Sequence, residues 1–380
     1  MNGPRHSRYI LVFLVLVAAT LLIPACAARR PVDVGFVATL SGPRSGMGIE
    51  EKNGVILAVE AVNAAGGIRG RPIRMHYADD QNDPEIARAV VSNYIDEGVE
   101  AIVGHMISGM TLATVNLAEE AGVVMVSPTS STSGLTGRDD HFFRVTVSLE
   151  QNAAIMAAYA HDDLGLDRIA AIYDRTNVGY ARQWAEAMDR SFRGLGGQGL
   201  DFYAFVGGSV SEYPQAAVLA LSGNPDAVVF VSGPIDTALI AQQIRKTDSR
   251  IPLLASSWSK TADLYTYGGS AVEGMAFSEL FSPESRDEDF LDFRNRFLDR
   301  FGYEPNFAGA QAYEAVLYLA EGLRRQAEGP RRGTLRDAMA SIRELKGTQG
   351  IIRFDEFGDA YRQYYILEIR DGRFSYVEAP

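Results

Sequence analysis

The sequence predicts an α/β protein that contains two doubly wound parallel sheets. From Pro31 onward, short runs of β-branched and apolar residues alternate with longer segments of helical periodicity, and Gly, Asp or Pro separates them. The short runs show little polar–apolar alternation, which is typical of strands that helices cover on both faces. The chain has 380 residues and the pattern restarts at Gln151. Repeated β-α-β units over this length favour two sheets in two lobes.

The first half of the chain begins with a predicted strand at 32–38. A turn rich in Ser and Gly leads from it into a helix whose apolar residues recur at 3.6-residue spacing. Asp83-Pro84 supplies an N-cap and a proline at the first helical position, which predicts where the next helix starts. Further strands are expected at 73–78, 101–104, 123–127 and 142–146, and a further helix at 108–121.

The second half repeats this alternation and then departs from it. Helices are expected at 151–164, 180–192, 213–222 and 236–246, and strands at 168–173, 200–206, 227–231 and 252–255. After Phe281 the patterns predict long helices at about 286–301 and 308–326, a helix at 334–344, and strands at 351–354, 364–370 and 373–377.

Charge and the N-terminus indicate an exported protein. The formal net charge is -12, and a surface of this sign repels phosphate backbones, so nucleic acid is not an expected partner. Arg5 and Arg8 precede an apolar stretch, 9–23, and small residues follow it at 25–27. A positive segment, a short apolar segment and small residues make a secretory signal peptide, here residues 1–25.

Cys26 is the single cysteine, so the folded protein can form no internal disulfide. The run Leu22-Ile23-Pro24-Ala25-Cys26 resembles a bacterial lipobox, in which the thiol is acylated. We therefore expect a lipoprotein with a tether at 26–31, anchored to a membrane through Cys26 in the periplasm or on the outer cell surface. Ala25-Cys26-Ala27 also fits an A-x-A site for plain secretion, and this alternative stays open.

Motifs of enzymes are either absent or out of context. Residues 194–199 satisfy G-x-G-x-x-G, but they follow a predicted helix and precede a strand, the reverse of a dinucleotide site. Residues 257–260 satisfy S-x-x-K without an independent K-T-G segment. The histidines are scattered without metal-ligand spacing. The sequence therefore predicts no enzyme, no metal site and no cofactor.

Hydroxyl- and glycine-rich turns follow several predicted strands of the first half. They occupy 41–46, 105–109 and 127–132, and the second turn opens a helix at Ser108-Gly109. Open α/β sheets bind ligands at the carboxyl ends of their strands. Helix N-termini and hydroxyl groups donate hydrogen bonds there, which suits a carboxylate. We therefore expect a ligand site at this sheet edge.

The chain also resembles the branched-chain amino-acid-binding (leucine/isoleucine/valine-binding-like) type I periplasmic binding proteins of ABC transporters. The matching segments are 39–43, 63–70, Asp79-Asp80 with Asp83-Pro84, 103–105, Ser127-Pro128, 273–275, 347–350, Phe354-Asp355 and Gly358-Asp359. They occur in order over about residues 32–370.

The resemblance implies two lobes joined by a three-segment hinge, with the ligand in the cleft between them. Lobe 1 would comprise residues 32–148 and 281–351, and lobe 2 residues 149–280 and 352–380. It also implies a receptor that closes on an amino acid or related small carboxylate and docks on an ABC permease. A ligand-sensing receptor of the same fold is the competing interpretation.

The resemblance carries site residues over by position. The expected ligand-binding residues are Ser108, Gly109, Thr129, Ser130, Ser131 and Met47 in lobe 1, and Tyr180, Ser257 and Trp258 in lobe 2. The lobe 1 turns would hold the ligand carboxylate, with Met47 where an aromatic residue often lines the pocket.

Lobe 2 departs from the family pattern. The expected tyrosine aligns with Val178, and the acid that would pair a ligand ammonium aligns with Ser257. Asp174, Glu150 or Asp236 could supply that charge. An aromatic acid or amide that lacks an ammonium and stacks on Trp258 or Tyr180 is the alternative ligand.

Overall fold

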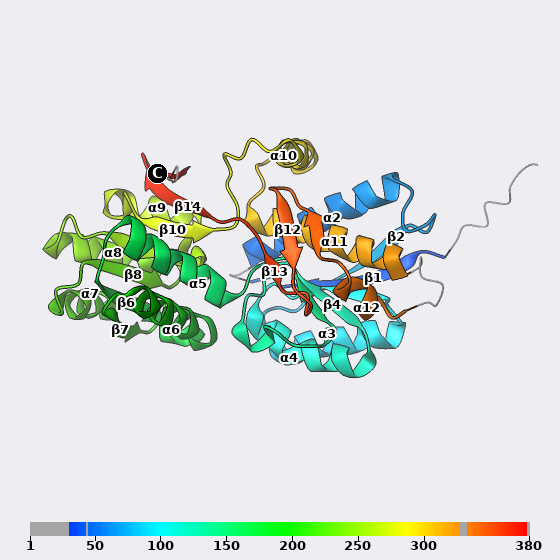
Figure 1. Ribbon diagram of the computed structural model, residues 1–380, viewed down its shortest axis with the longest axis horizontal. Coiled ribbons are helices and arrows are strands. Elements are labelled where there is room, and N and C mark those ends of the chain that lie inside the picture. Colours follow the sequence, from blue (N-terminus) through cyan, green and yellow to red (C-terminus); the bar gives the residue numbers. More distant parts are fainter. Residues whose placement is uncertain (1–29, 43–44, 327–332, 378–380) are drawn as a thin grey trace, which may run out of the picture.

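The computed structural model describes residues 30–42, 45–326 and 333–377. The expected signal peptide, Cys26 and most of the expected tether lie outside the described residues. The described chain forms two α/β lobes side by side, and the chain passes between them near the centre of the view (Figure 1). No helix in the described part has the length and apolarity to cross a membrane.

The first lobe contains a five-stranded parallel sheet in the order β2-β1-β3-β4-β5. Its strands are β1 (Val32–Ala38), β2 (Ile73–Asp79), β3 (Ala101–Val103), β4 (Val124–Ser127) and β5 (Phe142–Arg144). The helices are α2 (Ser45–Ala64), α3 (Pro84–Glu97), α4 (Ser108–Ala121), α10 (Glu288–Phe301), α11 (Phe307–Gln326) and α12 (Leu335–Ala340).

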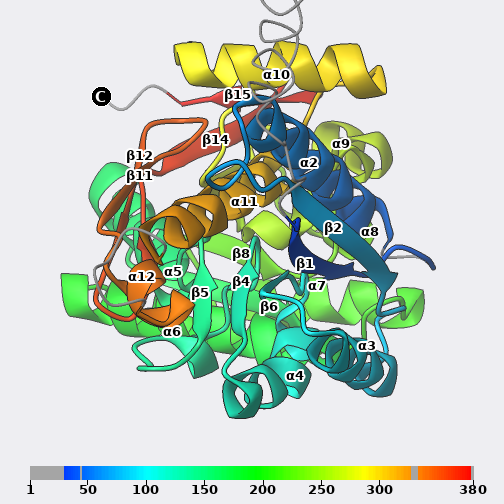
Figure 2. The same ribbon diagram turned by 90° about the vertical axis from the view of Figure 1, so that its right-hand side faces the viewer.

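Helices cover both faces of this sheet, as the unbroken apolar strands predict. Alternate residues of β1 point to opposite sides: Phe36 packs with α2 and α11, whereas Val37 packs with α3 and α4. Figure 2 shows α2 and α11 on one face and α3 and α4 on the other. Side chains that point to either face of the strand are therefore buried. This explains why the strand lacks the alternation of polar and apolar residues that is typical of a sheet with one face in solvent.

The second lobe contains a seven-stranded sheet in the order β15-β14-β10-β9-β8-β6-β7. The strands are β6 (Arg168–Asp174), β7 (Gly199–Phe205), β8 (Ala227–Val231), β9 (Leu253–Ala255), β10 (Ala276–Glu279), β14 (Tyr365–Arg370) and β15 (Arg373–Tyr376). The helices are α5 (Leu149–Ala158), α6 (Val178–Leu195), α7 (Tyr213–Ser222), α8 (Pro234–Thr247) and α9 (Ala262–Gly268). Strands β6 to β10 are parallel, whereas β14 and β15 are antiparallel, so this sheet is mixed.

Local sequence signals explain how individual helices begin and end. The Asp83 carboxylate accepts hydrogen bonds from the first backbone amides of α3, and Pro84 occupies its first turn, as predicted. Helices α3 and α4 end at Gly98 and Gly122, whose φ angles of 72° and 67° favour glycine. Helix α12 stops at Ala340, earlier than the predicted 344, because residues after it form strand β11 (Glu344–Lys346).

A small antiparallel sheet, β11-β12-β13, joins the first lobe. It contains β11, β12 (Ile351–Phe354) and β13 (Ala360–Tyr361). Residues from 352 onward were expected in lobe 2, but Ile352, Phe354 and Ala360 pack in the core of the first lobe. The chain joins the second sheet only at β14. The apolar pattern marks these strands without indicating which core receives them.

Candidate functional site

Ser108 and Ser130 meet at the carboxyl edge of the first sheet. Ser108 is the first residue of α4, and Ser130 lies in the turn after β4, with the two Oγ atoms 3.4 Å apart. The preceding residue, Ile107, makes no side-chain cap hydrogen bond to α4. Exposed Gly109 is in the first turn. Hydroxyl groups and an uncapped helix N-terminus thus lie together, and both donate to anions.

Thr129 faces the interior of the first lobe. Its Oγ1 lies 2.7 Å from Oε1 of Glu51 and 2.8 Å from the carbonyl oxygen of Met106. Glu51 is fully buried on α2, and burial raises the pKa of its carboxyl to about 8. Sequence reasoning missed Glu51 because a glutamate in a helix usually faces solvent. The available signal was its spacing of three residues from the buried glycines Gly48 and Gly54, on one helix face.

A buried polar network lies beside Thr129. His105 Nδ1 is 2.8 Å from Asp80 Oδ2, and the Thr39 hydroxyl donates to Asp80 Oδ1 at 2.6 Å. Burial alone would raise the pKa of Asp80, but these hydrogen bonds outweigh it and hold the pKa below its ordinary value. The Ser127 hydroxyl donates to the His105 carbonyl at 2.8 Å. The network fixes the turns after β2, β3 and β4 relative to one another.

Arg144 fastens the turn that carries Ser130. Its guanidinium is fully buried and donates to the carbonyls of Ser130 and Thr132 at 3.4 and 3.1 Å. Asp359, from the segment that precedes β13, balances the charge through Arg144 Nε at 2.7 Å. A charge-assisted pair in a buried setting therefore connects the C-terminal segment to the candidate site.

Tyr180 and Trp258 form the corresponding group in the second lobe. Their rings meet edge to face with centroids 5.8 Å apart and both are half-buried. Burial raises the pKa of Tyr180 to about 12, and the nearby Ser256 and Ser257 hydroxyls partly oppose that shift. Val178 is 52 % exposed on the first turn of α6.

An unforeseen ion pair lies next to this aromatic pair. Lys260 follows Trp258 closely, and its ammonium is 3.2 Å from Glu279 Oε2, with both side chains nearly buried. The ring centroids of Phe281 and Phe374 are 5.8 and 5.7 Å from the Lys260 nitrogen. Burial lowers the pKa of Lys260. Lys260, the last residue of the S-x-x-K match, therefore forms a buried ion pair with Glu279.

The three acids considered as partners for a ligand ammonium differ in whether their carboxylate oxygens already accept hydrogen bonds. Asp174 accepts from Thr176 and from the Gly207 amide, at 2.8 and 2.9 Å. Asp236 accepts from the Tyr213 hydroxyl and the Gly208 amide. Glu150, at the start of α5, has a buried Oε2 without a hydrogen-bond partner in the described chain.

The two groups of side chains occupy edges that approach one another. The Ser133 hydroxyl, just after the turn that follows β4, donates to Gln183 of α6 at 3.0 Å. At the crossover between the lobes, the Leu149 amide donates to the Ser131 carbonyl at 2.8 Å. Ser131 thus lies at the hinge, whereas Met47 packs against the core of the first lobe.

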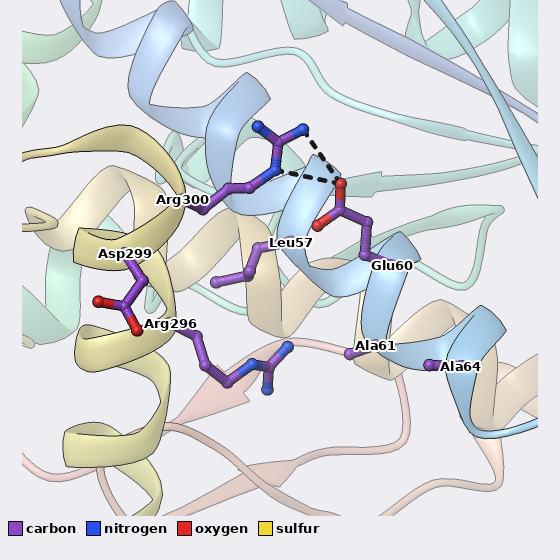
Figure 3. Close-up of a pocket in the computed structure, with 7 residues that line it drawn as sticks. All are labelled: Leu57, Glu60, Ala61, Ala64, Arg296, Asp299 and Arg300. Carbon is purple, nitrogen blue, oxygen red and sulfur yellow. Dashed lines mark hydrogen bonds and ion pairs between the residues drawn. The ribbon is translucent and has the colours of Figure 1, made fainter.

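Two surface cavities lie elsewhere. A groove of about 610 Å³ between α2 and α10 is lined by Glu60, Arg296, Asp299 and Arg300, with Leu57 at its floor (Figure 3). Its Arg300–Glu60 ion pair, at 3.3 Å, is half-exposed. A second cavity of about 300 Å³ lies between β7 and α7. Neither includes a residue predicted to bind ligand. Across the described residues, no cluster of three or more His, Cys, Asp or Glu side chains could hold a metal ion.

The comparisons with known proteins agree with this architecture. A family model described as "Periplasmic binding protein" matches residues 31–373. A Leu/Ile/Val-binding protein homolog from Brucella abortus (strain 2308) is 26 % identical over 355 residues, which cover 91 % of this chain and 93 % of the relative.

Solved structures show the same fold. A leucine-binding protein LivK from Thermotoga maritima is 26 % identical with a TM-score of 0.81, covering 91 % of this chain and 97 % of that one. A solute-binding protein from R. palustris in complex with benzoate is 19 % identical with a TM-score of 0.78, covering 91 % and 95 %. The chain therefore belongs to the periplasmic binding protein family and is similar to its branched-chain amino-acid-binding members.

Proposed function

We propose that this protein is an extracytoplasmic solute-binding lipoprotein of an ABC importer, and that it captures an amino acid or related small carboxylate by hinge closure. The observation that carries the proposal is the pairing of Ser108 and Ser130 at an uncapped helix N-terminus in one lobe. The Tyr180–Trp258 pair stands at the matching edge of the other lobe. Polar donors and an aromatic wall at a lobe junction suit a small amphipathic anion.

The carboxylate of the ligand is assigned to the first lobe. The Ser108 and Ser130 hydroxyls and the first amides of α4, including that of Gly109, supply donors without a formal positive charge. Such a site binds an anion through fixed dipoles, and the second lobe then closes over it. Thr129 beside Glu51, Ser131 at the hinge and Met47 beside the core complete the proposed lobe 1 contribution.

The second lobe leaves two ligand classes in competition. For an amino acid, the buried and unpartnered Oε2 of Glu150 is the available acceptor for an ammonium, because Glu279 is already paired with Lys260. A buried ammonium without such a partner would be costly. Ser257 offers no charge, and this favours the second class, an aromatic acid or amide stacked on Trp258 or Tyr180. The benzoate complex of a protein with the same fold supports that class.

The proposal extends to processing and partners. Residues 1–25 would be removed, Cys26 acylated and residues 26–31 left as a tether to the membrane. We propose lobe boundaries at the expected crossovers near 148 and 281. We propose the third boundary in the segment between β13 and β14, because Ile352 and Phe354 pack in the first lobe. The closed form would dock on an ABC permease. A sensor would use the same ligand site and dock on a regulator.

A ligand screen tests the proposal. The protein is unfolded and refolded to remove carried-over ligand, and its thermal stability is measured with amino acids, their oxo-acid analogues, aromatic acids, amides and sugars. A ligand at 100 times its Kd stabilises the folded form by about 2.7 kcal/mol. The S130A variant is the control for the carboxylate site. Stabilisation by carboxylates that S130A abolishes supports the proposal. Stabilisation by sugars alone, or by no compound, contradicts it.

A further inference from the structure

The hydrogen bonds of the Thr129 hydroxyl, which contacts Glu51, indicate the protonation state of the Glu51 carboxyl. The Thr129 Oγ1 atom lies within hydrogen-bonding distance of both Glu51 Oε1, at 2.7 Å, and the Met106 carbonyl oxygen, at 2.8 Å. A hydroxyl has one hydrogen to donate. A carbonyl oxygen only accepts, and an ionised carboxylate also only accepts. With Glu51 ionised, one of these two short contacts would join two oxygens with no hydrogen between them.

A neutral carboxyl resolves this conflict by supplying the second hydrogen. We infer that Glu51 is a neutral carboxylic acid in the folded protein at neutral pH, and that it donates to Thr129 while Thr129 donates to the Met106 carbonyl. Glu51 is then a positioning residue that orients a hydroxyl of the candidate ligand site. This role rests on the proposed function, whereas the protonation state does not.

The surroundings of Glu51 favour the neutral form. The side chain is fully buried, and its second oxygen, Oε2, is buried without a hydrogen-bond partner among the described residues. If the carboxyl were ionised, Oε2 would have no hydrogen-bond donor to offset the cost of burying its charge. Burial raises the pKa of Glu51 to about 8; the Thr129 hydrogen bond lowers it and the nearby charge of Asp80 raises it.

The charged groups packed around α2 do not offset this burial. Asp80, from the end of β2, bonds to His105 of the turn after β3 and to Thr39 after β1. The neighbouring carboxyl of Glu50 interacts instead with Tyr303 and Asn306, and burial raises its pKa to about 7. Among the described residues, no positively charged side chain forms a hydrogen bond with Glu51.

The orientation of Thr129 has a consequence for binding. With its hydrogen directed at Met106 and one lone pair occupied by Glu51, Thr129 has a remaining lone pair and can only accept from a ligand. The Ser108 and Ser130 hydroxyls, whose Oγ atoms lie 3.4 Å apart, remain the donors for a carboxylate. Ionisation of Glu51 above about pH 8 would redirect the Thr129 hydrogen and disturb this division of roles.

The protonation state is tested first in ligand-free protein, with Glu51→Gln as the variant. Its amide N–H replaces the acid O–H toward Thr129 at nearly equal volume. Infrared difference spectra at pH 6.5 should show loss of a protonated-carboxyl band in E51Q, and in the wild type that band should titrate near pH 8. The control, Glu50→Gln, should remove a different band with a lower midpoint.

Chemical unfolding gives a second readout of the same proton. Because the pKa of Glu51 in the folded protein is raised above the ordinary value of 4.5 for a glutamate, the stability that the proton provides is complete below about pH 4.5. It is lost as pH rises to about 8. The unfolding constant of the wild type relative to E51Q should therefore increase by about tenfold per pH unit across that window. A ratio that does not change with pH, together with loss of a carboxylate band in E51Q, would overturn the inference.

The positioning role is tested with the best carboxylate ligand from the stability screen. Wild-type affinity should fall by about tenfold per unit above pH 8, E51Q should retain its affinity there, and E50Q should behave as the wild type. Equal pH profiles for wild type and E51Q would overturn the positioning role. If no ligand binds any of the three proteins while the infrared band titrates as expected, the proposed function fails and the protonation of Glu51 stands.

Discussion

Removal of the charge at Asp359 should destabilise the first lobe and weaken ligand binding together. Asp359 Oδ1 accepts from Arg144 Nε at 2.7 Å and Nη2 at 2.6 Å, and Oδ2 accepts from the Gly137 amide at 2.6 Å. In Asp359→Asn the guanidinium loses its counter-charge inside the protein. The new amide group also cannot satisfy both Arg144 and Gly137 as an acceptor.

The expected loss of stability in D359N follows from the burial of the Arg144–Asp359 pair. The Arg144 side chain is 0 % exposed and that of Asp359 is 6 % exposed, so solvent cannot replace the lost carboxylate. Breaking a buried pair by removing one partner typically costs about 3–5 kcal/mol. For a unit of this size, that corresponds to a fall in Tm of roughly 6–20 °C. Ligand affinity should fall as well, because Arg144 holds the carbonyls of Ser130 and Thr132.

The assay is urea unfolding followed by circular dichroism, with an exposed pair as the matched control. Glu344 and Arg353 form an ion pair at 3.1 Å with side chains 60 % and 67 % exposed. Glu344→Gln should cost at most about 1 kcal/mol. If D359N costs no more than E344Q, the buried pair does not hold the C-terminal segment on the first lobe, and the reasoning is refuted.

Three further substitutions test the packing and the interlobe contacts. A Cβ at Gly54 would stand 2.1 Å from the Gly309 carbonyl oxygen, so Gly54→Ala should separate α2 from α11 and cost about 1–3 kcal/mol in thermal unfolding; an unchanged Tm contradicts this close approach. Ser133→Ala removes the 3.0 Å bond to Gln183 and should weaken ligand binding by about tenfold at most, measured by calorimetry, with Tm of the free protein unchanged. Trp258→Ala should abolish binding of aromatic ligands but leave the fold intact, and retained affinity would remove Trp258 from the site.

The fold was largely predictable because its signals are local. Strands such as 32–38 and 227–231 are short apolar runs, and the Asp83-Pro84 start of α3 depends on neighbouring residues alone. The fold differs from the prediction where contacts with residues distant in the sequence determine the structure of a segment. Residue 344 was expected to end a helix but begins β11, which pairs with β12, and residues from 352 onward were expected in lobe 2 but pack in the first lobe as far as Ala360.

The candidate site was predictable in part for the same reason. Ser108 and Ser130 follow strands that share one sheet edge, so their meeting follows from topology. Glu279 and Lys260, by contrast, lie 19 residues apart, and the Arg144–Asp359 contact spans 215. Charged side chains of this kind usually face solvent, and composition and periodicity do not reveal which ones a fold buries in pairs.

Closure of the two lobes on a ligand is the central claim, and a distance between them measures it directly. Spin labels are attached at Asn116→Cys on α4 and Arg190→Cys on α6, two exposed positions on different lobes, in a Cys26→Ser background. Pulsed electron paramagnetic resonance then records the interlobe distance with and without the ligand that stabilises the protein. Hinge closure predicts a shift to a single, shorter distance when ligand is added. An unchanged distance distribution at saturating ligand would contradict hinge closure.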